Sequence, residues 1–422
     1  MRNRKKITFT IAALLLSLLL LLTGLEIILR LSDVLLSHST QTLLDYGDTW
    51  IDYREGVGEG GFLKPNFNAQ VAGGYGGKVH WQNNSAGFRS ERDYIKQKPD
   101  NTYRILILGD SFTAGYRVDQ HKTYGYLLEQ NLETHRLIKE AEVLLSCIED
   151  PAHGLYYLQQ YGMQYHPDLI ILAVTLGNDI TETFLRVSER GDYSFELQDD
   201  SFIIEHNPKP ETVEYWDELE ELTLPQQVLA GSIQYQTTPP EESILHLSHV
   251  YRSLSGILNA KTIRNQPAAI ASGRRLEHAP LFDLSSGLGY FLEEPPSIIA
   301  EAWHRFFEVL QAYKILASSS DTLFAVALHP QRFQVQPPDW QATIAFYQLK
   351  PEYFNLTFPN EAVRKACGEN GIFLDPTDTM KEYYTTHRES LYFPNGDMHW
   401  NEAGHHLFAR FLFEQIIQMH EN

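Results

Sequence analysis

The side chains that could do chemistry in this chain include a serine and an Asp-x-His pair. Ser111 stands in a Gly-Asp-Ser-Phe-Thr segment, directly after a short aliphatic run. Asp397 and His399 stand two residues apart near the carboxyl terminus, and Trp400 follows them. A carboxylate on one ring nitrogen of a histidine leaves the other nitrogen able to take the proton of a serine hydroxyl. These residue types therefore predict an activated serine nucleophile.

Such a site also needs a hydrogen-bond donor that stabilises the negative charge on the reacting oxygen, and an asparagine is the candidate for it. Asn178 stands in Leu-Gly-Asn-Asp, after a second aliphatic run at 169–174. A side-chain amide at the end of a strand can donate to a developing oxyanion, and the glycine before it permits close backbone approach. Each segment alone also fits an ordinary turn or helix entry. Their occurrence together favours a catalytic site.

These side chains would be positioned by alternating strands and helices. Short aliphatic runs predict strands, and longer stretches with helical spacing of apolar residues predict helices between them. The predicted strands are 104–108, 143–148, 169–174, 323–328 and 372–374, and the predicted helices are 124–134, 154–165, 297–317, 361–369 and 402–419. Such alternation predicts an α/β fold with a parallel sheet. Ser111 and Asn178 would then lie at the carboxyl edge of the sheet, where open α/β sheets bind ligands.

The three motifs resemble those of the SGNH (GDSL-type) hydrolase superfamily. The Asp-x-His-Trp form is similar to the branch that includes membrane-anchored bacterial proteins and the alginate-acetylating proteins. The resemblance covers roughly residues 80–420, because the segment 84–89, Asn-Ser-Ala-Gly-Phe-Arg, resembles the lead-in of anchored members. It implies a flavodoxin-like three-layer sandwich with a central, mostly parallel sheet of about five strands.

The resemblance also implies a role for each site residue. Ser111 matches the nucleophile, His399 the base and Asp397 the residue that orients the base. Asn178 matches the side-chain oxyanion donor, beside the backbone N–H of Ser111. Gly154 is the match for a third donor after the second strand.

Chemistry of this type passes through an acyl-serine, and only the acceptor decides the outcome. With water as acceptor, the protein would be a serine esterase acting on a cell-surface glycan or a small ester. With a sugar hydroxyl as acceptor, it would be an O-acetyltransferase of an exopolysaccharide or cell-wall glycan, and a polytopic membrane protein could supply the acyl donor. A third alternative, of a different class, is a catalytically idle scaffold that binds glycans.

The amino terminus predicts a membrane anchor. A basic cluster within the first six residues precedes 7–24, which contain no charged residue. This is about the length that crosses a bilayer, roughly 17–25 residues, and the basic cluster favours a cytoplasmic amino terminus. We therefore expect residues 1–30 to form a single transmembrane helix and the catalytic domain to face the extracytoplasmic side of the cell membrane. A cleaved signal peptide is the alternative.

Four segments follow from these patterns. After the anchor (1–30), residues 31–100 form a juxtamembrane segment and lead-in. Its part 31–80 is rich in glycine and polar residues, for which a loosely ordered stalk or a wrapping of the domain edge is expected. The hydrolase-like domain is 101–422. Within it, the acidic region 182–296 breaks the alternation and predicts an inserted cap or lid, with helical spacing of apolar residues at 244–258.

Composition excludes some partners. The formal net charge of −20 disfavours nucleic acid, which needs a basic surface. No metal or cofactor signature stands out, so none is predicted. The two cysteines, Cys147 and Cys367, are compatible with two free thiols or one bridge. His329, which ends the fourth predicted strand, is predicted to be structural because His399 is available as the base.

Overall fold

Five aliphatic segments form one parallel sheet in the computed structural model of the chain. The strands are β3 (Thr102–Gly109), β4 (Glu140–Cys147), β5 (Leu169–Thr175), β8 (Leu323–His329) and β9 (Ile372–Leu374). Every neighbouring pair is parallel, in the order β4-β3-β5-β8-β9. β3 and β5 lie inside the sheet and are buried on both faces, which explains their continuous aliphatic runs.

The structure describes most of the chain outside its amino terminus and the middle of the inserted region. The described residues are 61, 63–75, 78–135, 138, 140–189, 191–207, 287–347, 349–369, 371–393 and 398–421. All of them belong to one compact unit of the chain. The predicted anchor (1–30) lies outside these ranges, and among the described helices none is long and apolar enough to cross a membrane.

The strand order places a switch point between β3 and β5. The chain passes from β3 outward to β4 and then crosses back to β5 on the other side of β3. In open α/β sheets, a crevice for ligands opens outside the carboxyl ends of the strands at such a point. Ser111 follows β3 and Asn178 follows β5, so both predicted site residues lie at the edge of the sheet where such a crevice is expected.

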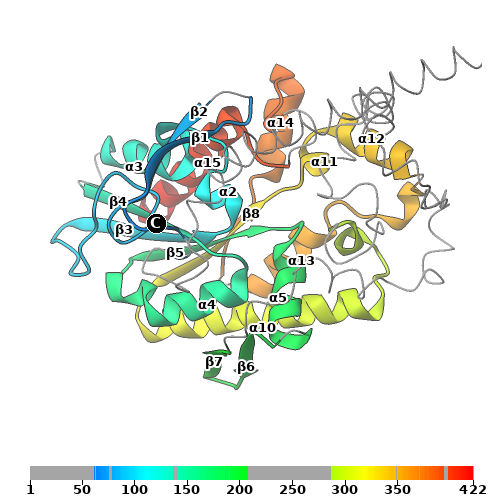
Figure 1. The fold of residues 1–422 in the computed structure, drawn as a ribbon. Coiled ribbons are helices and arrows are strands. Elements are labelled where there is room, and N and C mark those ends of the chain that lie inside the picture. The colour runs from blue at the N-terminus through cyan, green and yellow to red at the C-terminus, as the bar shows by residue number, and fades with distance from the viewer. Residues whose placement is uncertain are drawn as a thin grey trace, which may run out of the picture. The chain divides into compact units, whose positions relative to one another are not determined.

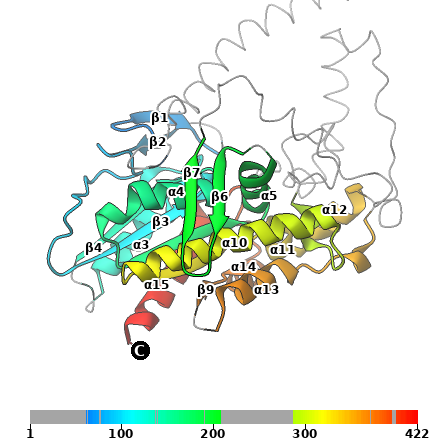
Figure 2. The same cartoon turned by 90° about the horizontal axis from the view of Figure 1, so that it is seen from below.

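Helices cover both faces of the sheet (Figures 1 and 2). On one face lie α3 (Tyr124–Glu133) and α15 (Glu402–Glu421), which pack against each other. The other face carries α4 (Pro151–Gln160), α5 (Asp179–Phe184) and α10 (Ser297–Ser319). The result is the α/β fold with a parallel sheet that the alternation predicted, in the three-layer arrangement that the resemblance implied.

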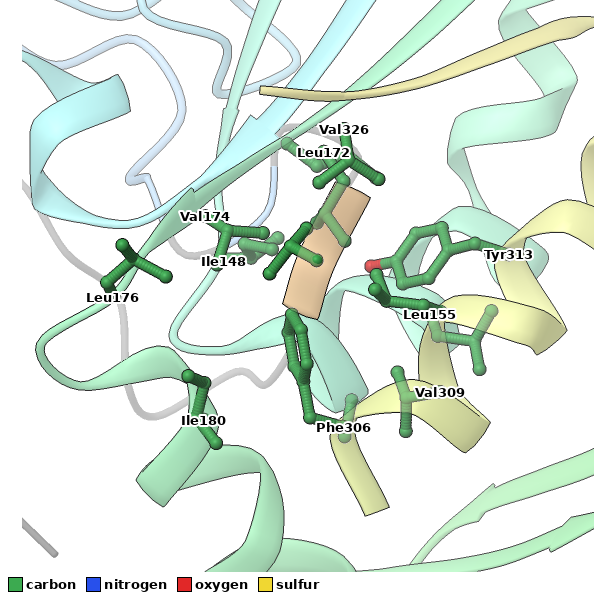
Figure 3. Packing of buried hydrophobic residues seen from close by; sticks show 14 of the residues in the cluster. Ile148, Leu155, Leu172, Val174, Leu176, Ile180, Phe306, Val309, Tyr313 and Val326 are labelled. Atoms are coloured by element: carbon green, nitrogen blue, oxygen red, sulfur yellow. The ribbon is translucent and has the colours of Figure 1, made fainter. Parts of the chain in front are cut away.

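Alternate residues of β3 point into the two cores between these layers. Leu106 and Leu108 join the core that includes α4, α5 and α10, whereas Ile105 and Ile107 join the core beneath α3 and α15. Figure 3 shows the first core, where side chains of β5 meet those of α4 and α10. Burial of an aliphatic side chain contributes about 1.5–3 kcal/mol. Both cores therefore hold the carboxyl edge of the sheet in place.

The remaining elements surround this sandwich. They are β1 (Asn68–Ala72), β2 (Lys78–Gln82), α2 (Ser111–Ala114), η1 (Gln120–Lys122), η2 (Gly162–Tyr165), the π-helix η3 (Leu185–Glu189), β6 (Tyr193–Leu197), β7 (Phe202–His206), η5 (Leu288–Phe291), α11 (Arg332–Val335), α12 (Pro337–Tyr347), η6 (Pro351–Tyr353), α13 (Phe358–Cys367) and α14 (Thr377–His387).

Two segments outside the alternating pattern form hairpins. In the segment expected to be a loosely ordered stalk or an edge wrapping, the described residues contain an antiparallel hairpin, β1 with β2, and Trp81 on β2 is fully buried. This ring packs in one cluster with Ala114 of α2 and Cys147 of β4, contacts that no local periodicity encodes. The inserted region 182–296 starts with the end of α5 and with η3, and a second hairpin, β6 with β7, follows, while the expected helical cap at 244–258 lies outside the described residues. Cys147 and Cys367 are free and buried.

Candidate active site

Ser111 is presented by a tight turn from strand to helix. β3 ends at Gly109, Asp110 caps α2, and Ser111 is the first residue of that helix. The Asp110 carboxylate accepts the backbone N–H of Phe112 at 2.9 Å. A side chain at position 109 would meet Thr113 Oγ1 at 2.1 Å, so the turn needs a glycine there. Gly109 and Asp110 thus shape the turn that presents Ser111.

His399 lies directly beside the serine. The distance between His399 Nε2 and Ser111 Oγ is 2.8 Å, which is hydrogen-bond contact. Ser111 is partly exposed, whereas His399 is buried. The imidazole also lies near the rings of Phe112 and Tyr116, at 5.0 and 4.9 Å between centroids. This is the geometry in which a histidine can remove the serine proton.

The start of α15 fixes the loop that carries His399. Asn401 caps the helix, because its side-chain oxygen accepts the N–H groups of Ala403 and Gly404 at 2.9 and 3.1 Å. The carbonyl of His399 accepts the N–H of Phe393 at 3.0 Å. Trp400 is fully buried between the rings of Phe112, His329 and Phe408. The Trp of the motif therefore anchors its histidine.

Asp397 falls outside the described residues, as do 394–396. Its role as the residue that orients His399 stays a prediction.

Asn178 reaches the same crevice from β5. It precedes α5, and its Nδ2 lies 3.1 Å from Glu182 Oε2 and 3.5 Å from Asp110 Oδ2. The amide is therefore oriented by two carboxylates, one of which belongs to the turn that presents Ser111. Prediction from sequence missed Glu182, although its spacing of four residues from Asn178 on one helix was a usable signal.

Asn178→Ala is expected to lower the turnover number by about 10²–10³-fold, because one oxyanion donor is lost. The Michaelis constant should change much less, since the developing charge exists only in the transition state. Steady-state kinetics with an aryl acetate would measure both values. Gln164→Ala serves as a control, because Gln164 is an exposed amide after α4. Equal turnover for Asn178→Ala and wild type would rule Asn178 out as a donor.

The structure corrects the prediction for Gly154. It lies within α4, and its N–H donates to the carbonyl of Asp150 at 2.9 Å. The helix begins earlier than expected because Asp150 caps it and Pro151 occupies its first position. An added Cβ would lie 2.4 Å from both Ile148 Cδ1 and Tyr313 OH. Gly154 thus serves close helix packing, and its amide is not aimed at the crevice.

Gly154→Ala separates these two roles experimentally. Overpacking at this position should destabilise the fold by about 1–3 kcal/mol, which thermal or urea unfolding would measure. The turnover of the folded protein should stay at the wild-type value, because no oxyanion donor is lost. A drop in turnover of 10-fold or more at unchanged folded fraction, about 1.4 kcal/mol in the barrier, would contradict the packing role.

Two buried carboxyl groups lie beneath the crevice. Burial raises the pKa of Asp110, which the hydrogen bond from Phe112 and the charge of His399 partly oppose. Burial also raises the pKa of Asp179 well above its usual value, and the charge of Asp110 adds to this. Asp179 accepts the N–H of Thr175 at 2.7 Å, so its carboxyl holds the end of β5 against the start of α5.

His329 has the scaffold position that the sequence predicted. Its Nδ1 lies 3.1 Å from Thr175 Oγ1, and its ring stacks on Phe112 at 5.1 Å between centroids. Burial lowers the pKa of His329 to about 3, and the charge of His399 acts in the same direction. The imidazole is therefore neutral at physiological pH and supports the ring of Phe112 next to the nucleophile. Within the described ranges, no group of three or more His, Cys, Asp or Glu side chains could hold a metal ion.

Comparison with known proteins gives only distant structural likenesses. No family model matches the sequence, and no curated protein matches it. An acetyl xylan esterase shares 10% identity, with a TM-score of 0.33 over 74% of this chain and 99% of the esterase. An acetylxylan esterase from Geobacillus stearothermophilus also shares 10% identity, with a TM-score of 0.33 over 76% and 96% of the two chains. An α/β hydrolase from the metagenome of Lake Arreo shares 10% identity, with a TM-score of 0.35 over 74% and 94%. These TM-scores are below 0.5, so the likenesses carry no conclusion about function, and the chain's own side chains must supply it.

Proposed function

We propose that this protein is a serine esterase that acts through an acyl-serine at Ser111. The observation that carries the proposal is the contact of 2.8 Å between Ser111 Oγ and His399 Nε2. The two residues are far apart in the sequence and meet at the switch point of the sheet, where ligands of open α/β sheets bind. Asn178 lies at the same crevice. A nucleophile in contact with its base is the arrangement that nucleophilic catalysis requires.

The chemistry follows from this arrangement in two half-reactions. His399 Nε2 takes the proton of Ser111 as its Oγ bonds to the carbonyl carbon of the ester. Asn178 Nδ2, which gives up its long 3.5 Å contact with Asp110 Oδ2, and the Ser111 N–H, at the first position of α2, donate to the oxyanion. The carbon–oxygen bond to the alcohol then breaks, and the proton on His399 passes to the leaving oxygen. Water repeats these steps on the acyl-serine and releases the acid.

The acceptor of the second half-reaction distinguishes two enzymes with the same site. A sugar hydroxyl in place of water would make the protein an O-acetyltransferase, the alternative to which the Asp-x-His-Trp resemblance points. In either case we propose a single membrane anchor at 1–30, with the catalytic domain on the extracytoplasmic side. The proposed substrates are esters or acylated glycans, and the transferase would take its acyl group from a polytopic membrane partner.

A fluorophosphonate probe tests the proposal on the whole chain. Attack by an activated serine forms an Oγ–P bond and releases fluoride, so the protein should gain one phosphonyl group on the peptide that contains Ser111. Mass spectrometry would locate it. A folded protein that takes up no label would argue for a glycan-binding scaffold. For the labelled enzyme, release of acetate in the presence and absence of oligosaccharides would separate hydrolysis from transfer.

A further inference from the structure

The lead-in segment 84–89 has no part in the chemistry above, yet it reaches the nucleophile's loop. Asn84 shapes the segment, because its side-chain oxygen accepts the N–H groups of Ala86 and Phe88 at 3.0 Å each. Gly87 has a φ of 94°, which favours glycine. Arg89 then pairs with the edge of β4, since its N–H donates to the carbonyl of Leu145 at 3.3 Å. This turn directs the side chain of Arg89 into the protein.

The guanidinium of Arg89 binds the loop that follows α2. Its Nη2 donates to the carbonyl of Val118 at 2.7 Å, and its Nη1 donates to the carbonyls of Gly115, at 2.6 Å, and Ala114. The planar group also lies over the ring of Trp81, with Cζ 3.6 Å from the ring centroid. A planar fork of donors suits several carbonyls at once, which an ammonium group does not match.

Arg89 is almost completely buried, with 2% of its surface exposed. Burial lowers the pKa of Arg89 to about 9, which the charge of Asp119 opposes, so the group stays charged at neutral pH. A buried charge is costly unless it is hydrogen-bonded. The backbone carbonyls of 114–118 accept from Nη1 and Nη2, and Gln120 Oε1 accepts from Nε at 3.2 Å, so a displacement of this loop would leave two of the three nitrogens of a buried cation without their acceptors.

The same loop touches both partners of the candidate site. The N–H of Tyr116 donates to the carbonyl of Ser111 at 3.0 Å. The ring of Tyr116 lies 4.9 Å from the ring of His399. Gly115, whose carbonyl accepts from Arg89 and which directly precedes Tyr116, adopts a left-handed conformation with a φ of 66°. The position of residues 114–118 therefore sets where the nucleophile stands with respect to its base.

We propose that Arg89 is a positioning residue, whose guanidinium holds residues 114–118 and thereby fixes Ser111 with respect to His399. The inference rests on the proposed function of that site. Displacement of a reacting group by about 1 Å can cost on the order of 10²-fold in rate. The segment 84–89, which precedes the sheet in the sequence, thus contributes to the geometry of the site.

Arg89→Met and Arg89→Lys test this inference, with Arg104→Met as the matched control. Arg104 is likewise buried, and its guanidinium likewise donates to a backbone carbonyl, that of Tyr165, in addition to the carboxylate of Glu142. It lies near the beginning of β3, whereas Ser111 follows the end of that strand. Both arginines should support stability, but only Arg89 should support the geometry of the site.

At equal folded fraction, Arg89→Met is expected to lower turnover by about 10–100-fold with little change in the Michaelis constant. Arg89→Lys keeps the charge without the fork and should fall between Arg89→Met and wild type. Arg104→Met should lower the melting temperature alone. Wild-type turnover in Arg89→Met, or an equal loss in Arg104→Met, would overturn the inference.

Hydrogen–deuterium exchange provides a readout that does not depend on activity. Peptides covering 111–118 should exchange faster in both Arg89 variants and at the wild-type rate in Arg104→Met. Unchanged exchange in the Arg89 variants would overturn the positioning role. Absence of fluorophosphonate labelling in the wild type would instead overturn the proposed function, so the two failures are distinguishable.

Discussion

Replacement of Ser111 by alanine is expected to abolish labelling by a fluorophosphonate and to lower ester turnover by about 10⁴–10⁶-fold, the range typical of triad residues. The physical reason is that alanine has no oxygen to form the acyl intermediate. The fold should persist, because Ser111 is partly exposed and Asp110 caps α2 without it. Turnover of an aryl acetate and the melting temperature would measure both effects.

Ser146→Ala is the matched control for that variant. Ser146 lies on β4, directly beside Leu108 of β3 in the register of the sheet. Its hydroxyl is buried and has no hydrogen-bond partner among the described residues. Loss of this oxygen should leave labelling and turnover unchanged. If Ser111→Ala kept wild-type turnover, the nucleophile assignment would be wrong.

The second large effect is expected for His399→Ala. Without the imidazole, the hydroxyl of Ser111 keeps its proton and attacks poorly, so turnover should again fall by about 10⁴–10⁶-fold. Residues that act as a unit are strongly non-additive, and the double variant with Ser111→Ala should be no slower than either single variant. Steady-state kinetics on the three variants would establish this coupling.

His405→Gln controls for general damage to the same region. His405 is buried in the first turn of α15, and its Nδ1 accepts the N–H of Tyr124 at 3.2 Å. Glutamine retains an acceptor, so the helix should stay in place and turnover should stay close to wild type.

An additive loss in the double variant of Ser111 and His399 would show that the two residues act independently.

The buried carboxyl groups bear on how the oxyanion site works. Asn178 is oriented by the carboxylates of Glu182 and Asp110, which hold the amide nitrogen rather than its oxygen toward the turn of Ser111. A negative charge so close would oppose an oxyanion at the same place. Burial raises the pKa of Asp110, which disfavours its charged form. Of the two groups that position the donor, Asp110 is thus the one whose charge burial disfavours.

Local patterns in the sequence determined the architecture to a large extent. The aliphatic runs predicted all five strands of the sheet, because residues buried on both faces must be apolar at consecutive positions. The helix after His399 was predicted to begin at 402, where α15 begins. The Gly-Asp-Ser and Gly-Asn-Asp segments were predicted to follow strands, as they do. These features depend on short stretches of chain, which a sequence displays directly.

The tertiary structure alone decided which distant groups meet. Contact between Ser111 and His399 spans 288 residues, and it depends on the strand order and on the packing of Trp400. The helical position of Gly154 depends on the cap that Asp150 provides one turn earlier, and it removed that glycine from the oxyanion site. Arg89 binds the nucleophile's loop across 25–29 residues. Such contacts follow from close packing between elements, which no local periodicity encodes.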